Sequence, residues 1–287
     1  MWLTKNVQYK SSKPISPWRK ISLGSWRPTG DSSTHTTLEL NIEPVQAFLK
    51  EFNENNNCQC NVLQYFSWVM AQTIKKYPYI NQSVRFGRIY QRKDVDIFLH
   101  VAIDKVKGDN LSGIVIRTSQ DLSLLQFSKE VEGKLKILTE LDDPEFKVIK
   151  SVFNRMPGIF SRTFLNISKF VQYKLNLWSP LFGSPRDVFG SIQISNVGSF
   201  GIDNAIVPIA PYTNIPMVVA LGSLKKRPFV INDKVEAIKT VKAGFTGDHR
   251  LMDGVQFGQM QKEIIRYFNH PSSTCERTKI TTPPTPI

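Results

Sequence analysis

A histidine and an aspartate four positions after it occupy residues 247–254, which read Gly-Asp-His-Arg-Leu-Met-Asp-Gly. The imidazole of His249 can take up a proton near neutral pH, so it is a candidate general base. Asp253 could order the turn that carries the histidine, and Gly254 tolerates backbone angles that other residues cannot adopt. A single histidine in a turn is more often a surface or capping residue, so spacing alone does not assign catalysis.

A second segment, residues 189–201, combines a strand pattern with a glycine-rich turn. Ser195 lies on the last alternation of the strand and is followed by Asn196. By itself, a serine in a strand is only a tolerated polar residue. It becomes a candidate for chemistry only together with the histidine segment.

The elements that must position these residues form a strand-turn-helix unit. Residues 239–245 read as a strand, and residues 255–268 read as a helix with apolar side chains at 257, 260, 264 and 268. An α/β protein exposes reactive groups where a strand turns into a helix, as it does around His249. His35 and His100 lie in other predicted strands, and we interpret both as structural.

Hydrophobic periodicity and the positions of helix-breaking and turn-forming residues predict the remaining elements. A helix opens at Pro44 and ends at residues 53–57, and Pro78 stops the helix that follows it. The expected strands are 33–42, 84–90, 97–103, 112–117 and 217–222, the expected helices also include 62–76 and 122–141, and a basic hairpin is expected at 224–228.

The composition bounds the class of protein. The chain has 287 residues, 41% hydrophobic residues and a formal net charge of +13, which favours anionic partners. No nucleic-acid motif accompanies the charge, so nucleic acid ranks last. Three cysteines form neither an easy disulfide nor a metal cluster, and no apolar run reaches the length of a membrane span. We expect a cytoplasmic protein without metal, mitochondrial if eukaryotic. The basic, acid-free first 30 residues look like a transit peptide, but we discount this interpretation because we expect part of them to belong to the fold.

Residues 157–180 carry an amphipathic helical pattern. Apolar residues at 160, 164, 167, 171, 175 and 178 form one stripe, and Arg162, Lys169 and Lys174 lie on the other face. Such a helix suits an anionic membrane surface or a carrier protein. The alternative is that the helix lies on the protein's own sheet or on an interface between copies.

The two motifs together resemble the catalytic domain of the 2-oxoacid dehydrogenase acyltransferases. Asp-His-Arg-x-x-Asp-Gly at 248–254 is similar to the active-site motif of this family, and Ile-Ser-Asn-x-Gly at 194–198 is similar to its serine segment. Condensation domains and wax-ester synthases carry a related motif with two adjacent histidines, whereas here Asp248 and Arg250 flank a single one. The resemblance covers roughly residues 15–270 and is weakest across 120–185.

This resemblance implies a fold, a reaction and an assembly. The fold is α/β and like that of chloramphenicol acetyltransferase, a two-layer sandwich in which helices cover a mixed β-sheet. The reaction is acyl transfer from coenzyme A to a thiol, hydroxyl or amine, with His249 as base and Ser195 stabilising the oxyanion. The assembly is a homotrimer whose sites lie between subunits. A match at residues 15–21 also implies that Arg19 pairs with Asp253, while Asp248 and Arg250 brace the turn.

The expected organisation is an irregular arm (1–14), a catalytic domain (15–270) with a basic insertion at about 148–185, and a disordered tail (271–287). No lipoyl domain is recognised, so we expect a stand-alone catalytic domain with acyl-CoA as substrate and no lipoyl group of its own. Two other functions stay open: a non-catalytic trimeric scaffold or membrane-peripheral assembly module, and condensation-type ester or amide formation on a carrier protein.

Overall fold

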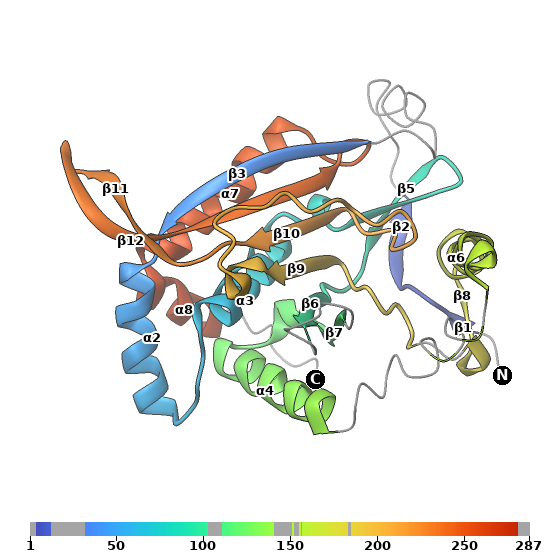
Figure 1. The fold of residues 1–287 in the computed structure, drawn as a ribbon, viewed down its shortest axis with the longest axis horizontal. Coiled ribbons are helices and arrows are strands. Elements are labelled where there is room, and N and C mark those ends of the chain that lie inside the picture. The colour runs from blue at the N-terminus through green and yellow to red at the C-terminus, as the bar shows by residue number, and fades with distance from the viewer. Residues whose placement is uncertain are drawn as a thin grey trace.

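Figure 1 shows the computed structural model of the chain. It describes residues 4–12, 32–102, 111–140, 151, 155, 157–182 and 185–280.

A mixed seven-stranded sheet forms the centre of the molecule. The strand order is β11-β12-β10-β9-β6-β7, and β3 pairs along the other edge of the long strand β12. Strand β9 runs parallel to both of its neighbours, β6 and β10, and the other pairs are antiparallel. The strands are β3 Ser33–Asn41, β6 Ile97–Ala102, β7 Leu111–Ile116, β9 Ile192–Asn196, β10 Met217–Leu221, β11 Lys225–Ile231 and β12 Lys234–Asp248.

A layer of helices covers one face of this sheet, and α3 and α7 lie behind its central strands in Figure 1. Phe66 of α3 packs against Phe245 of β12 and against Phe268 of α7, with ring centroids 6.4 and 6.2 Å apart. The two-layer α/β arrangement expected from the sequence is therefore confirmed. The helices are α2 Glu43–Asn56, α3 Val62–Lys76, α4 Leu124–Glu140, α7 Gly254–Asn269 and α8 Pro271–Ile280, and single turns lie at η1 Pro78–Ile80, η2 Ser119–Asp121 and η6 Val197–Phe200.

The opposite face of the sheet is covered by irregular chain. Gly244 of β12 has the carbonyl oxygen of Ala205 so close that an added Cβ would lie 2.0 Å from it. Gly222 meets the carbonyl of Asp203 in the same way. Glycine at these two positions lets the segment after β9 lie directly on the strands.

Smaller sheets surround the centre. β2 Tyr9–Ser12, β5 Arg88–Arg92 and β4 Gln82–Arg85 form one, and β1 Thr4–Lys5 pairs with β8 Leu177–Trp178. The prediction of one strand over 84–90 was wrong, because Phe86 and Gly87 adopt φ angles of 44° and 71° and turn the chain into a hairpin.

The predictions for the two segments that flank the catalytic domain, the arm and the tail, need correction. The arm is not irregular throughout, since residues 4–5 and 9–12 pair as strands. The tail is not disordered from residue 271, because Pro271 begins the helix α8, where Thr274 is buried and donates to the His270 carbonyl at 2.7 Å. Residues 281–287 lie outside the described part of the chain.

The insertion contains η3 Gly158–Phe160, α6 Ser161–Lys169, the π-helical turn η4 Phe170–Lys174 and η5 Pro180–Phe182. Its apolar stripe faces away from the protein: Phe160, Ile167 and Leu175 are 57%, 59% and 41% exposed. The expectation that this stripe packs on the protein's own sheet is therefore wrong, and its alternative, packing on an interface between copies, stays a prediction. The face that contacts the protein carries Gln172, Tyr173 and Lys174 and makes hydrogen bonds to other segments of the chain.

Candidate active site

His249 follows the last residue of β12, at the point where the strand turns toward α7. Its backbone N–H donates to the carbonyl of Ser32 at 2.7 Å, and its Nδ1 lies 2.9 Å from the carbonyl oxygen of Met252. A carbonyl only accepts, so Nδ1 must carry the proton. In the neutral ring the basic lone pair is then on Nε2, as a general base requires.

Asp248 holds the chain on either side of the histidine. Its carboxylate accepts from the Arg250 backbone N–H at 3.0 Å and from the guanidinium Nε at 2.9 Å and Nη2 at 2.5 Å. The Ser32 hydroxyl donates to the same carboxylate at 3.1 Å. Hydrogen bonding to Asp248, ahead of the opposing effect of burial, raises the pKa of Arg250. A charge-assisted fork with two parallel hydrogen bonds is geometrically specific, so it restrains the turn.

Asp253 is the N-cap of α7. Its side chain accepts from the Val255 N–H at 3.1 Å, and its own N–H donates to the Gln256 side chain at 2.9 Å, which completes a capping box. Arg19, the partner that we expected for Asp253, lies outside the described residues. Gly254 is not one of the glycines with positive φ, and an added Cβ would meet nothing within 4 Å. The unusual backbone that we expected at Gly254 is therefore absent.

Ser195 lies on β9 in register with Ala220 of β10, which is in register with Gly244 of β12. Ile194 beside it is buried in the core under the helices. Successive side chains of a strand point to opposite faces, so Ser195 is on the face away from the helices, where it is half-buried. Asn196 is on the helix-covered side.

The strand register separates Ser195 from His249 within one chain. Asp248 lies four residues beyond Gly244 along β12, or about 13 Å, and β12 is two strand spacings, about 10 Å, from β9. Proton transfer needs heavy atoms about 2.6–3.2 Å apart. The histidine and the serine of one chain therefore cannot act on the same substrate atom in this arrangement.

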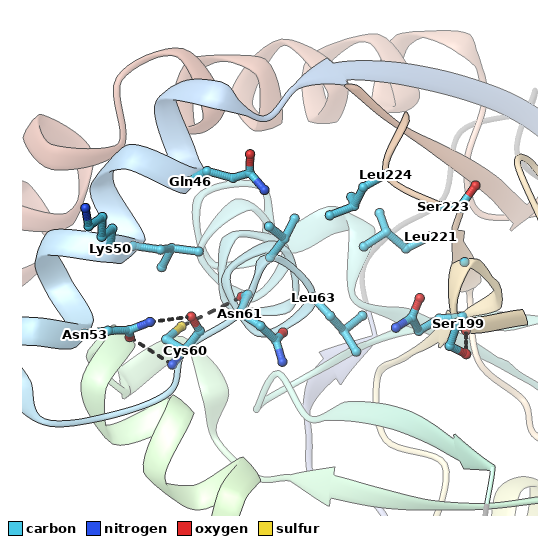
Figure 2. Close-up of a pocket in the computed structure, with 15 residues that line it drawn as sticks. Gln46, Lys50, Asn53, Cys60, Asn61, Leu63, Ser199, Leu221, Ser223 and Leu224 are labelled. Atoms are coloured by element: carbon cyan, nitrogen blue, oxygen red, sulfur yellow. Dashed lines mark hydrogen bonds between the residues drawn. The ribbon is translucent and has the colours of Figure 1, made fainter. Parts of the chain in front are cut away.

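A pocket of about 560 Å³ opens beside the end of β9 (Figure 2). Figure 2 shows Gln46 and Lys50 of α2 on one side, with Leu221 and Ser199 on the other. Its lining includes Asn196 but neither Ser195 nor His249, so this pocket is not the reaction chamber. Burial raises the pKa of the Cys60 thiol in its wall to about 12, and the thiol is therefore not a nucleophile at neutral pH.

Two further histidines have structural partners. His35 lies 3.1 Å from the Thr246 hydroxyl, and His100 lies 3.2 Å from the Gln193 side chain with its ring against Phe98. Burial lowers the pKa of His100. Within the described residues, no group of histidine, cysteine and acidic side chains is arranged to hold a metal ion. In the same part of the chain, no helix has the length and apolarity needed to cross a bilayer.

The sequence did not reveal the contributions of Ser32 and Met252. Both act partly through backbone carbonyls, which carry no signature of residue type. The Ser32 hydroxyl precedes β3, far from His249 in the sequence, and only the pairing of β3 with β12 brings them together. Of the predicted site residues, the structure gathers Asp248, His249, Arg250 and Asp253 in one turn and leaves Ser195 and Asn196 apart.

Comparison with known proteins gives a family match. Residues 12–137 and 184–275 match a family model described as the catalytic domain of the 2-oxoacid dehydrogenases acyltransferase. The chain is 25% identical over 243 residues to a dihydrolipoyllysine-residue succinyltransferase component of the 2-oxoglutarate dehydrogenase complex from Buchnera aphidicola, covering 82% of this chain and 50% of that protein. It is 21% identical over 272 residues to a lipoamide acyltransferase component from Bacillus subtilis, covering 91% and 53%. The chain thus spans about half the length of these relatives.

Solved structures support the same fold. The cubic core of a pyruvate dehydrogenase multienzyme complex superposes with a TM-score of 0.62 at 16% identity, covering 92% of this chain and 93% of that one. A probable dihydrolipoamide acetyltransferase from Listeria monocytogenes gives a TM-score of 0.59 at 15% identity, covering 96% and 98%. The family match stops at residue 137 and resumes at 184, so most of the insertion is outside it.

Proposed function

Because the chain belongs to the 2-oxoacid dehydrogenase acyltransferase family, we propose that it transfers an acyl group between coenzyme A and a thiol, hydroxyl or amine acceptor. The relatives carry the dihydrolipoyllysine residue in their names, so dihydrolipoamide is the first acceptor to test. The observation that carries the proposal is the hydrogen bond from His249 Nδ1 to the Met252 carbonyl, which leaves Nε2 as the base.

The reaction needs two groups of the protein. Nε2 of His249 takes the proton of the acceptor thiol, and the thiolate attacks the carbonyl carbon of the acyl-CoA thioester. The new carbon–sulfur bond makes a tetrahedral intermediate, whose oxyanion accepts a hydrogen bond from the Ser195 hydroxyl. Collapse breaks the bond to the CoA sulfur, and the imidazolium returns the proton to that sulfur. The products are the acylated acceptor and free coenzyme A.

The separation of Ser195 and His249 within one chain favours a site made by two chains. We expect a homotrimer in which the histidine of one copy faces the serine of its neighbour, because a ring of three copies repeats one such contact around its axis. A pocket built this way would also explain why the cavity beside Asn196 contains neither residue.

One relative bears on these roles. A structural and enzymatic study of the Azotobacter vinelandii dihydrolipoamide acetyltransferase concerned the catalytic roles of a serine, a histidine and an asparagine four residues after that histidine. Asp253 has the same spacing from His249 here. In this chain we assign Asp253 to holding the turn through the helix cap, and not to proton transfer.

The test is release of coenzyme A from a panel of acyl-CoAs, with dihydrolipoamide, amino alcohols and amines as acceptors. We expect His249→Ala to abolish turnover, and Ser195→Ala to lower kcat by about 10²–10³ because one oxyanion donor is lost. Both variants should keep the circular dichroism spectrum and solution mass of the wild type. That control separates lost chemistry from lost folding.

Two other outcomes would point elsewhere. If no acyl-CoA is consumed and none binds by calorimetry, while the assembly persists in His249→Ala, a non-catalytic scaffold becomes the better account. If acyl groups move only from a carrier protein, the reaction is of the condensation type, which the single histidine makes the weaker alternative.

A further inference from the structure

The insertion exposes an unusual number of large apolar side chains. We call them the apolar patch: Ile159, Phe160, Phe164, Ile167, Phe170, Leu175 and Leu181. Ile159 and Leu181 are 82% and 78% exposed. Phe86, at the tip of the β4–β5 hairpin, is 63% exposed and extends the patch, since its ring centroid lies 6.4 Å from that of Phe170. So many exposed apolar side chains on one short segment commonly mark an interaction site.

The helix is held with this face outward. Asn6 donates from its side chain to the Gln172 carbonyl at 3.1 Å, and Lys174 Nζ donates to the Val84 carbonyl at 3.3 Å. Arg85 Nε in turn donates to the Lys174 carbonyl at 3.1 Å. Tyr173 is buried. The inner face is thus fixed to the protein by specific polar contacts, and the apolar stripe has no place in the core, the reverse of an ordinary surface helix.

The charge of the segment limits what can cover the patch. Residues 157–182 contain Arg162, Lys169 and Lys174 and no aspartate or glutamate. Of these three cations, Arg162 is exposed, whereas Lys169 and Lys174 are half-buried and Lys174 Nζ is bonded to the Val84 carbonyl. A partner therefore has to offer an apolar layer together with negative charge.

The position of the patch favours a lipid surface over a family-wide protein contact. Figure 1 shows α6 at the edge of the molecule, apart from the helix layer formed by α2, α3, α4 and α7. The family match omits residues 138–183, so an assembly that the family shares does not depend on this segment. Aromatic and aliphatic side chains on one side of a helix with basic residues nearby are the signature of helices that lie in the bilayer interface.

We propose that the apolar patch docks the protein on the surface of an anionic lipid bilayer. The aromatic and aliphatic side chains enter the boundary between headgroups and acyl chains, the exposed Arg162 contacts anionic headgroups, and the net charge of +13 attracts the chain to an anionic surface. The protein does not cross the bilayer.

Flotation of the full chain with vesicles tests this proposal. The vesicles are phosphatidylcholine alone, or phosphatidylcholine and phosphatidylglycerol in a two-to-one mixture. We expect flotation with the mixture only, and weaker flotation as salt is raised. The double variant Phe160→Ser/Ile167→Ser should bind the vesicles at least about tenfold more weakly than the wild type, because two side chains that enter the lipid are lost.

The matched control is the double variant Val230→Ser/Val235→Ser. These residues pair across the β11–β12 hairpin and are 65% and 73% exposed, but they lie outside the patch. All four substituted side chains are exposed, so both variants should fold, and the control should float like the wild type. Absence of flotation, or flotation that the patch variant leaves unchanged, would overturn the proposal. A patch variant that floats normally but has a smaller solution mass would show that the patch joins copies of this chain instead. The assay needs no turnover, so it is independent of the acyltransferase proposal.

Discussion

Asp248 is the residue on which the geometry of the turn that carries His249 depends. It is 7% exposed, and its carboxylate serves the Arg250 backbone, the Arg250 guanidinium and the Ser32 hydroxyl at once. Its own carbonyl accepts from Leu251 and Met252 at 2.9 and 3.0 Å. Met252 then presents the carbonyl that fixes the His249 ring. Asp248 therefore sets the position of the His249 ring in two ways: its carboxylate holds Arg250 and Ser32, and its carbonyl holds Met252.

Asp248→Asn tests this role. An amide keeps the shape but loses the negative charge, so the fork to Arg250 weakens. We expect kcat to fall roughly tenfold to a hundredfold, because small misplacement of a catalytic group is costly. The free energy of unfolding should fall by about 1–3 kcal/mol, the usual effect of losing a hydrogen bond to a charged group. Turnover assays and denaturant unfolding measure the two effects.

The control is Asp121→Asn, which removes a carboxylate from the exposed ion pair with Lys75 at 3.4 Å. Exposed pairs contribute little to stability, so this variant should resemble the wild type. Full activity in Asp248→Asn would mean that the turn holds its shape without the fork.

At the scale of elements, α3 and α7 are tied by a carboxylate between two cations. Glu263 of α7 accepts from Lys76 of α3 at 2.8 Å and from Arg266 at 2.6 Å. Burial raises the pKa of Glu263, but the hydrogen bonds from Arg266 and Lys76 outweigh it and the net pKa is lowered. Because α7 begins shortly after His249, this contact also anchors the helix that follows the turn.

The lowered pKa gives a pH dependence with a definite sign. The folded state binds the proton more weakly than the unfolded state, so the contact stabilises the fold above the unfolded pKa of about 4.3. The stabilisation disappears as the pH falls through the pKa of Glu263 in the folded state, which is lower than its pKa in the unfolded state. We expect Glu263→Gln to reduce the free energy of unfolding by about 1–2 kcal/mol at pH 7. This is the low end of the usual range for hydrogen bonds to charged groups, because Lys76 is half-exposed and solvent screens its charge.

The difference between this variant and the wild type should vanish in acid, where both side chains are neutral. Denaturant unfolding at several pH values measures it, with the exposed Glu236→Gln as control. A difference that persists at pH 2 would assign the effect to packing and not to charge.

Elements whose start and end are both marked by nearby residues could be predicted from the sequence. The helix at 62–76 has a capping box between Asn61 and Gln64, and basic residues in its last turn, so its bounds match. The hairpin at 82–92 was missed because Phe86 takes positive φ, which its residue type does not suggest. For the insertion, periodicity revealed the apolar stripe but not its direction, since direction depends on polar contacts with Asn6 and Val84.

For the site, the sequence identified the turn but not the distance between its two motifs. Asp248, His249 and Arg250 are neighbours in the chain, so any strand-to-helix turn keeps them together. The separation of Ser195 from His249 depends on the register of β9 with β10 and of β10 with β12. Those pairings join segments far apart in the sequence, and local patterns do not encode their offset.

At the scale of the whole molecule, this separation predicts how defective copies should behave together. His249→Ala and Ser195→Ala each lack one group, and each keeps the group that the other lacks. If a site takes its histidine from one copy and its serine from the next, mixed assemblies regain complete sites. In a ring of three with random mixing in equal amounts, about a quarter of the sites are complete, because each contact needs the right copy on both sides.

The experiment is to co-express the two variants, purify the mixed assembly through two different tags and measure coenzyme A release. Because purification through both tags removes assemblies of a single variant, every remaining ring of three has one complete site, and we expect about a third of the wild-type rate per chain, against almost none from either variant alone. Simply mixing the purified variants without exchange of subunits is the control and should stay inactive. A site contained in one chain predicts no recovery under any mixing, since every chain would lack one of its two groups. Recovery would therefore establish that the chain works only as an assembly, and it would do so without knowledge of the natural acceptor.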